Sequence, residues 1–250
     1  MRVLKLAAMM MLMCSLNIAW AIQYEQRQWQ GIQFSVIKVT DLSGLSLKLN
    51  QRNDTPFLTF DAIQAAQPHC RIDFAMNAGM FHADFSPVGL YIENQHMKKP
   101  LNTAQQGHGN FLIQPNGVLY WDQDKAHIAT TQDYQKRLVK PLFATQSGPM
   151  LVVNGKLNQN FIQGSESKKI RNGVGVANGQ LWFVLAEDLI NFYDFAEFFR
   201  VQLNIQQALY LDGGSVPSLY LPQQQRNLQR RFLGPMVIWQ NNTKCRKKPD

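Results

Sequence analysis

Short runs of alternating apolar and polar residues, separated by turn residues, recur along this 250-residue chain and restrict it to folds rich in β-sheet. Ile32–Val39 and Leu45–Leu49 alternate in this way, and the turn residues between them predict a hairpin. An Asn-Gly pair between apolar runs is a strong hairpin signal. Such pairs stand at Asn116-Gly117, Asn154-Gly155 and Asn178-Gly179.

Other short apolar runs extend this pattern. Strands are expected at Arg71–Met76, Val88–Glu93, Gly109–Gln114, Val118–Trp121, Pro149–Val153, Gly173–Ala177, Gln180–Ala186 and Ala208–Leu211. Helical spacing favours one helix over Asn191–Gln206, with Asn191 as N-cap and an aromatic stripe that we assign to core packing, and a shorter helix from Phe60 that ends before Pro68. With neither an internal repeat nor a linker, the pattern predicts an α+β fold: a single domain built on a large twisted mixed or antiparallel sheet with a few helices.

The first 21 residues have the layout of a secretory signal peptide. Arg2 and Lys5 precede an apolar stretch at Leu6–Leu16, and Ala19-Trp20-Ala21 supplies small residues before a cleavage point. The stretch is short of the roughly 20 apolar residues that a membrane-spanning helix needs. We therefore predict cleavage after Ala21, a mature domain over residues 22–250, and a periplasmic or secreted location; an uncleaved anchor is the alternative.

Composition excludes some classes of function. The formal charge is +8, but the basic residues gather in a tail and on surface segments without interleaved aromatics, so nucleic acid is not an expected partner. Neither Cys nor His residues show zinc-ligand spacing. In an oxidising compartment, Cys70 and Cys245 could form a disulfide.

The acyl-hydrolase elbow, the phosphate-binding loop and the His-Glu-x-x-His motif are absent from the sequence. Polar residues and glycines instead follow the predicted strands. Asp212-Gly213-Gly214-Ser215 comes directly after Ala208–Leu211, which presents a carboxylate at a strand end beside glycines that let a ligand approach the backbone. An ordinary turn would explain the same residues.

Further polar groups follow other strands. Asn77 and Gly79 end the run from Arg71, and Ser147-Gly148 precedes an apolar strand. Arg171 could hold a phosphate with its planar guanidinium. The adjacent carboxylates Glu187 and Asp188 could share proton transfer, hold a cation, or start the following helical segment.

Four blocks together resemble the signature of the phosphodiester glycosidase family, which includes bacterial relatives of the lysosomal N-acetylglucosamine-1-phosphodiester α-N-acetylglucosaminidase. They are Asn77–Phe81, Gln146–Pro149, Arg171–Gly175 and Leu211–Ser215. The resemblance covers nearly the whole mature chain. This chain departs from the family's usual Asn-Gly-Gly-Tyr/Phe-Phe at Ala78 and Met80, and from its Asp-Gly-Gly-Gly-Ser-Ser after Gly214.

The resemblance implies an exported hydrolase that cleaves the sugar–phosphate bond of a glycosyl phosphodiester, for example an N-acetylglucosamine-1-phosphodiester, or of a related envelope glycan. It implies catalytic roles for Asp212, Glu187 and Arg171. Asp212 or Glu187 would act as base or nucleophile, and Arg171 would hold the phosphate with the amides of Gly213 and Gly214. The implied substrate-binding residues are Asn77, Gly79, Ser147, Gly148, Gly213, Gly214 and Ser215.

We expect no cofactor, with a divalent cation on Glu187 or Asp188 as a minor alternative. The expected partner is a small molecule or glycan that carries a sugar-1-phosphodiester, and no stable membrane span is expected after signal cleavage. Two other functions remain open: a non-catalytic carbohydrate-binding or exopolysaccharide-assembly protein that uses the same cleft, and a hydrolase of a non-phosphorylated glycoside. Binding without turnover would favour the first, and a substrate panel with and without phosphate would separate the second.

Overall fold

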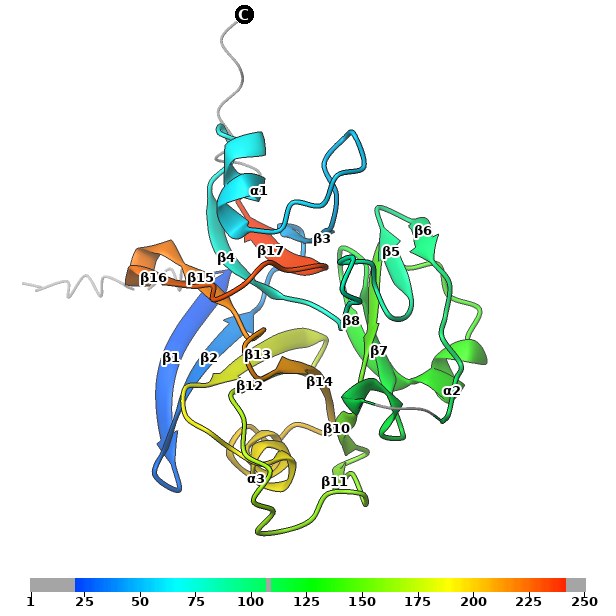
Figure 1. Ribbon diagram of the computed structural model, residues 1–250, viewed down its shortest axis with the longest axis vertical. Helices are drawn as coiled ribbons and strands as arrows, with labels where there is room; N and C mark the ends of the chain where they lie inside the picture. Colours follow the sequence, from blue (N-terminus) through cyan, green and yellow to red (C-terminus); the bar gives the residue numbers. More distant parts are fainter. Residues whose placement is uncertain (1–20, 107–108, 242–250) are drawn as a thin grey trace, which may run out of the picture.

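The computed structural model describes residues 21–106 and 109–241, in which antiparallel strands form three sheets (Figure 1). The seven-stranded sheet has the order β1 (Ile22–Trp29), β2 (Ile32–Val39), β13 (Gln180–Ala186), β12 (Arg171–Ala177), β14 (Gln207–Gly213), β10 (Met150–Val153), β11 (Lys156–Leu157). A five-stranded sheet has the order β16 (Arg226–Leu228), β15 (Leu219–Leu221), β4 (Ile72–Asn77), β17 (Met236–Gln240), β3 (Leu45–Lys48). The other has the order β6 (His96–Lys99), β5 (Tyr91–Glu93), β9 (Phe143–Ser147), β7 (Gly117–Trp121), β8 (Ala126–Thr130).

Helices are short in this structure. The α-helices are α1 (Phe60–Ala66), α2 (Thr131–Gln135) and α3 (Phe192–Glu197). A π-helix over Phe198–Gln202 continues α3, and 3₁₀ turns occupy Asn110–Leu112 and Pro222–Gln224.

One hydrophobic core joins the three sheets. Leu47 of β3, Phe74 of β4, Leu119 of β7 and Val174 of β12 are all buried in it. The opposite face of the seven-stranded sheet is covered by α3 and the π-helix, which bury their aromatic side chains there. The predicted α+β class with a single domain is therefore confirmed, and the strands are divided among three sheets.

Local turn chemistry explains the two hairpins that the sequence located correctly. Asn154 and Gly155 have φ of 50° and 75°, and Asn178 and Gly179 have φ of 52° and 74°. Left-handed conformations at both central residues define the turn that matches the twist of a hairpin, and Asn-Gly adopts it easily. These turns join β10 to β11 and β12 to β13.

Three expectations about strands and hairpins are wrong. β2 and β3 form no hairpin, because β2 pairs with β1 and β13, whereas β3 pairs with β17 in another sheet. The expected strand Gly109–Gln114 contains a 3₁₀ turn instead. Asn116-Gly117 makes no hairpin either, since the buried Asn116 amide donates to the Phe111 carbonyl and Gly117 begins β7, which pairs with β8 and β9.

The predicted helix is confirmed at its start but is shorter than expected. The Asn191 side chain accepts a hydrogen bond from the Asp194 amide at 2.9 Å, as an N-cap does. The π-helix ends at Gln202, ahead of the predicted Gln206. Phe195 and Phe199 are fully buried, which confirms the assignment of the aromatic stripe to the core.

The predicted signal segment lies almost wholly outside the described residues, as does Cys245. Cys70 is disulfide-bonded, and its pairing with Cys245 stays a prediction. Within residues 21–106 and 109–241, none of the helices is long and apolar enough to cross a membrane.

Candidate functional site

A β-bulge decides which way the polar residues at the end of β14 point. Asn172 of β12 lies opposite Asp212, and Gly173 lies opposite Tyr210, so Leu211 is an extra residue in β14. In an antiparallel pair, opposite residues share a face and successive residues alternate. Asp212 therefore shares a face with Asn172, and the residue opposite Arg171 is Gly213.

A ring of buried amides supports Asp212 from that face. The Asn172 amide donates to Asn77 Oδ1 at 2.7 Å, and the Asn77 amide donates back at 3.4 Å. Asn172 Oδ1 also accepts from the Asp212 backbone amide at 3.0 Å, and Asn77 Oδ1 accepts from the Ser218 amide at 2.9 Å. Because buried polar groups are costly unless they are paired, this network fixes the end of β14 against β4.

The carboxyl group of Asp212 titrates near neutral pH. Burial raises its pKa to about 6 from an ordinary 3.8, although the Gly213 amide and the Arg231 guanidinium oppose the shift. A carboxylate with such a pKa can exchange a proton close to physiological pH, which is the property of a general acid or base.

Asp212 lines a cleft of about 850 Å³. Its wall is formed by the segment after β4, the start of α1, and the segment that follows β16. The lining residues are Thr59, Asp61, Phe81, His82, Ala83, Phe85, Asp212, Val216, Asn227, Gln229, Arg230, Arg231 and Phe232. Its size is typical of a small-molecule site.

Both positive charge and aromatic surface lie in this cleft beside Asp212. Arg230 and Arg231 are exposed, and the Arg231 guanidinium donates to Ser215 Oγ at 2.9 Å. The Phe85 ring packs edge-on against Phe232 at 6.4 Å between ring centroids. An anion with an attached ring compound, such as a sugar phosphate, matches this chemistry.

Arg171 lies on the opposite face of the sheet and is already satisfied. Its side chain is buried and donates to Ile190 O at 2.8 Å, Ser167 O at 3.0 Å and the Tyr210 hydroxyl at 3.4 Å. The guanidinium carbon lies 3.6 Å from the Phe192 ring centroid. Burial lowers the pKa of Arg171, while Tyr210 opposes this shift. Arg171 does not line the cleft that contains Asp212.

The two glycines after Asp212 use their amides within the protein. The Gly213 amide donates to the Asp212 carboxylate at 2.7 Å, and the Gly214 amide donates to Ile170 O at 3.0 Å. A Cβ atom at Gly213 would collide with the Tyr210 hydroxyl, so this position requires glycine for packing. In this conformation neither amide points free into the cleft.

The remaining predicted binding residues contact the protein itself. Gly79 donates its amide to Thr145 Oγ1 at 3.2 Å, and a Cβ atom there would collide with the same hydroxyl. Ser147 donates to Leu211 O at 2.7 Å, which ties β9 to β14. A Cβ at Gly148 would lie 2.7 Å from that of Asn116. These residues, with Asn77, surround the end of β14, and their roles in substrate binding stay predictions.

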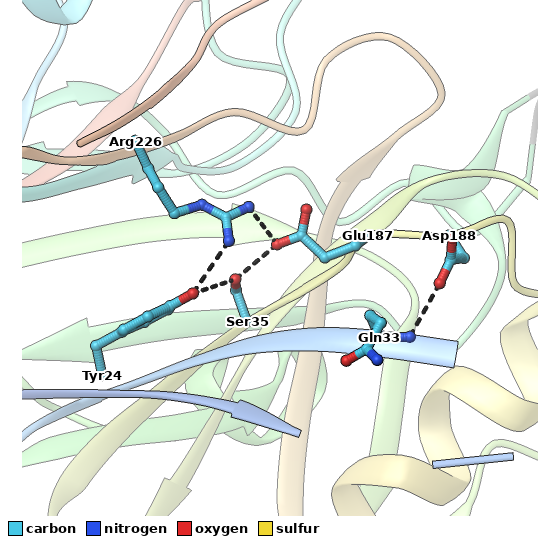
Figure 2. A network of polar contacts seen from close by, with 6 residues as sticks. All are labelled: Tyr24, Gln33, Ser35, Glu187, Asp188 and Arg226. Carbon is cyan, nitrogen blue, oxygen red and sulfur yellow. Dashed lines mark hydrogen bonds and ion pairs between the residues drawn. The ribbon is translucent and has the colours of Figure 1, made fainter. Parts of the chain in front are cut away.

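The adjacent carboxylates Glu187 and Asp188 point to different partners, as Figure 2 shows. Glu187 Oε1 accepts from Arg226 Nη2 and from Ser35 Oγ, each at 2.6 Å. Asp188 accepts from the Gln33 backbone amide at 2.9 Å. Glu187 is therefore not brought together with Asp212 in the cleft, and its catalytic role stays a prediction. No three His, Cys, Asp or Glu side chains converge within the described ranges in a way that could hold a metal ion.

Sequence reasoning missed the segment that closes the cleft. Arg230 and Arg231 were interpreted as solvated surface, and Asp61 and Gln229 carried no signal. A basic pair followed by an exposed aromatic, Phe232, directly after a short strand was the available clue.

Comparisons with known proteins identify the family of the sequence and structures with the same fold. The family model described as phosphodiester glycosidase matches residues 71–245. The Escherichia coli (strain K12) "Uncharacterized protein YigE" is 43% identical over 152 residues, which cover 60% of this chain and 59% of that protein. The chain thus matches less than two thirds of that relative's length.

Two solved structures share the fold. The catalytic domain of zebrafish N-acetylglucosamine-1-phosphodiester α-N-acetylglucosaminidase, auto-inhibited by its pro-peptide, superposes with a TM-score of 0.59 at 13% identity, over 89% of this chain and 84% of that one. A hypothetical protein from Synechocystis superposes with a TM-score of 0.57 at 15% identity, over 88% and 62% of the two chains. Since the family model spans more than half of the sequence, the chain belongs to the phosphodiester glycosidase family.

Proposed function

We propose that this protein is a hydrolase that cleaves the bond between the anomeric carbon of a sugar and the phosphate of a glycosyl phosphodiester, in the cleft beside Asp212. The observation that carries the proposal is a carboxyl group with a pKa of about 6 at the edge of a cleft that also holds two exposed arginines. Membership of the phosphodiester glycosidase family supports the same chemistry.

The reaction needs only water beside the substrate. Asp212, as carboxylate, accepts a proton from a water molecule that attacks the anomeric carbon. Alternatively, it attacks that carbon itself and forms a glycosyl ester, which a water molecule then hydrolyses to release the sugar and regenerate the carboxylate. The bond from that carbon to the phosphate oxygen breaks, and its electron pair leaves with the phosphate monoester. Because a phosphate is a good leaving group, protonation of that oxygen is less necessary than in an ordinary glycoside.

Arg231 is the group that we propose to hold the phosphate, with Arg230 beside it in the cleft. A guanidinium can bind two phosphate oxygens at once and is charged at any physiological pH. Arg171, the sequence-based candidate, contacts carbonyl oxygens and the Tyr210 hydroxyl on the other face of the sheet. The substrate-binding role therefore moves to the segment that follows β16.

We also propose that the reaction takes place outside the cytoplasm, in the periplasm or after secretion. The support is the sequence of residues 1–21, with its basic start, apolar centre and small residues at Ala19 and Ala21. Fractionation of cells that produce the full chain, with mass measurement of the exported form, tests this part separately. A mature protein that begins at Ile22 is expected, and a cytoplasmic full-length chain would contradict it.

The central experiment is a substrate panel for the mature protein. It contains N-acetylglucosamine-1-phosphodiesters, a nucleotide-linked N-acetylglucosamine, and matched glycosides without phosphate. Release of free sugar is measured for the parent, Asp212→Asn and Arg231→Gln. The matched control is Asp54→Asn, because Asp54 is an exposed loop residue with a left-handed φ of 61° that asparagine also tolerates.

We expect turnover only of the phosphodiesters, with kcat lowered about 10²–10⁴-fold in Asp212→Asn, the usual contribution of a general acid or base. Arg231→Gln should raise KM, and Asp54→Asn should match the parent. Turnover of phosphate-free glycosides would assign a different hydrolase. Glycan binding without any turnover would assign a binding protein.

A further inference from the structure

We propose that Glu187 is a positioning residue that holds Arg226 and thereby fixes the cleft wall, which we define as Asn227–Phe232. This inference rests on the proposed function, because the wall carries Arg231 to the phosphate. In this inference Glu187 acts by holding Arg226 and does not contact the substrate.

The cleft wall has little backbone support. It begins in β16, which is the outermost strand of its sheet and, among residues 21–106 and 109–241, pairs with β15 alone, over three residue pairs from Leu219↔Leu228 to Leu221↔Arg226. An edge strand hydrogen-bonded on one side, and this short, is the part of a sheet that opens most easily. Side-chain contacts therefore decide how rigidly the wall is held.

Arg226 makes the contacts that anchor the start of the wall (Figure 2). Its Nη2 donates to Glu187 Oε1 at 2.6 Å, and its Nη1 donates to the Tyr24 hydroxyl at 3.0 Å. Ser35 Oγ donates to the same Glu187 oxygen at 2.6 Å and lies 3.3 Å from the Tyr24 hydroxyl. Tyr24 and Ser35 belong to β1 and β2, and Glu187 directly follows β13, so the network joins the edge of one sheet to the seven-stranded sheet.

Because it is partly buried, the Arg226–Glu187 ion pair should stabilise the wall more than an exposed ion pair would. The Arg226 and Glu187 side chains are 19% and 23% exposed. Exposed ion pairs contribute little, because water and salt screen them and long side chains lose entropy. Arg226 is held by two hydrogen bonds from one guanidinium to partners that are themselves hydrogen-bonded, which restricts its position.

The rest of the wall is held by hydrogen bonds to uncharged partners. The Gln229 side chain accepts from the Phe60 amide at 3.1 Å and donates to Leu58 O at 2.8 Å. Arg231 donates to Ser215 Oγ at 2.9 Å. Arg226 thus supplies the charged anchor at one end of the wall, and Gln229 supplies the anchor to α1 in its middle.

The geometry of Glu187 fits positioning better than proton transfer. The carboxylate oxygen Oε1 already accepts two hydrogen bonds, one of them from a guanidinium. Among the described residues, those that line the cleft include Asp212 but not Glu187.

The test compares Glu187→Gln, Arg226→Gln, their double variant and the milder Tyr24→Phe in the mature protein. Glu25→Gln is the matched control, because Glu25 forms an exposed ion pair with Arg27 at 2.7 Å on β1, outside the cleft lining. Three quantities are measured for each folded protein: hydrogen exchange of the backbone amides over residues 226–232, the affinity for inorganic phosphate, and the pH profile of kcat and KM on the phosphodiester that the parent turns over.

We expect faster exchange in the cleft wall, and weaker phosphate binding and a higher KM, each by about tenfold, the size of one lost charge-assisted hydrogen bond. The value of kcat should change less than about threefold, and its pH profile should keep its shape. The double variant should be no worse than either single variant, because both remove one interaction. Tyr24→Phe should act in the same direction with a smaller effect.

Two results would overturn the inference. One is unchanged exchange and phosphate affinity in both single variants. The other is a loss of kcat together with a limb of the pH profile in Glu187→Gln alone, which would make Glu187 an acid or base. If the parent turns over no substrate, the proposed function fails, but the exchange and phosphate measurements still decide whether Glu187 positions the wall.

Discussion

Two arginines, one on each face of the β12–β14 pair, differ in burial and in what their guanidinium groups contact. On the α3 face, Arg171 is buried, stacked on Phe192 and hydrogen-bonded to carbonyl oxygens. On the other face, Arg231 is exposed, lines the cleft and acts on the Asp212 carboxyl group. An arginine whose donors are satisfied by the protein serves the fold, whereas one that faces an open cleft beside a carboxyl group with a raised pKa is available to a ligand.

The largest expected effect is a difference in the free energy of unfolding between leucine variants of these two arginines. Arg171→Leu should lower the free energy of unfolding by about 3 kcal/mol, because the carbonyls of the buried Ile190 and of Ser167 lose their donor and a buried guanidinium site loses its packing. Arg231→Leu, on the surface, should change it by less than about 0.5 kcal/mol. Urea denaturation of both variants measures this. Equal destabilisation would break the comparison, and so would an Arg171 variant that stays stable but no longer binds phosphate.

Asp212→Asn should make the protein more stable at neutral pH while it lowers kcat about 10²–10⁴-fold. The pKa of Asp212 is about 6 when folded, against 3.8 ordinarily, so between these values the folded state binds more protons and stability falls as pH rises. The variant should remove that fall and gain about 2 kcal/mol at pH 7. Urea midpoints at pH 4 and pH 7 test this; a parent as stable at pH 7 as the variant would contradict a buried carboxylate.

Alanine substitutions at Gly213 and Gly214 should differ in their effect on stability, because only Gly213 packs against the α3 face of the sheet. A methyl group at Gly213 meets the Tyr210 hydroxyl that Arg171 contacts, so Gly213→Ala should cost about 2 kcal/mol of stability through overpacking. Gly214 has a φ of +72° and open space around it, so Gly214→Ala should cost only the backbone strain of about 1 kcal/mol. Thermal unfolding of the two variants compares them. A Gly214 variant that proves the less stable would mean that packing on the α3 face is looser than described.

The smallest expected effect is a shift in the pH dependence of kcat/KM. If Asp212 is the base, activity should rise with pH through about 6. Arg231 lowers the pKa of Asp212, so Arg231→Gln should move this limb to higher pH. Arg52→Gln, in an exposed loop, is the control and should leave the limb in place. A limb that stays in place in Arg231→Gln would mean that Arg231 acts on the substrate alone.

Features that depend on a few consecutive residues could be predicted from the sequence. The Asn154-Gly155 and Asn178-Gly179 turns and the Asn191 cap are such features, because backbone conformation and local hydrogen bonds specify them. The partner of a strand is set by distant residues. β1, with its polar run, was not recognised as the neighbour of β2, and β3 was placed in the wrong pairing as a result.

The candidate site divides in the same way. Asp212 could be found, because a carboxylate and glycines directly after a buried strand form a local signal. Arg171 was also found, but the sequence around it does not reveal the register of β12 and β14. It therefore could not show that Arg171 and Asp212 lie on opposite faces of the sheet. Arg231 was missed, since a basic pair on a surface segment looks the same whether or not a cleft lies beside it.

The extra residue in β14 has a consequence for how this chain can change in length. Loops usually accept insertions and deletions, because little depends on their count of residues. If the pairing of β14 with β12 continued past Tyr210 without this bulge, Leu211 would lie opposite Asn172 and Asp212 opposite Arg171, where acid and base would neutralise each other inside the protein. An insertion next to Leu211 would likewise move Asp212 by one position, toward the face of Arg171. Such insertions should therefore be excluded from functional variants of this chain even where the fold survives them, while the exposed loop around Asp54 should vary freely in length.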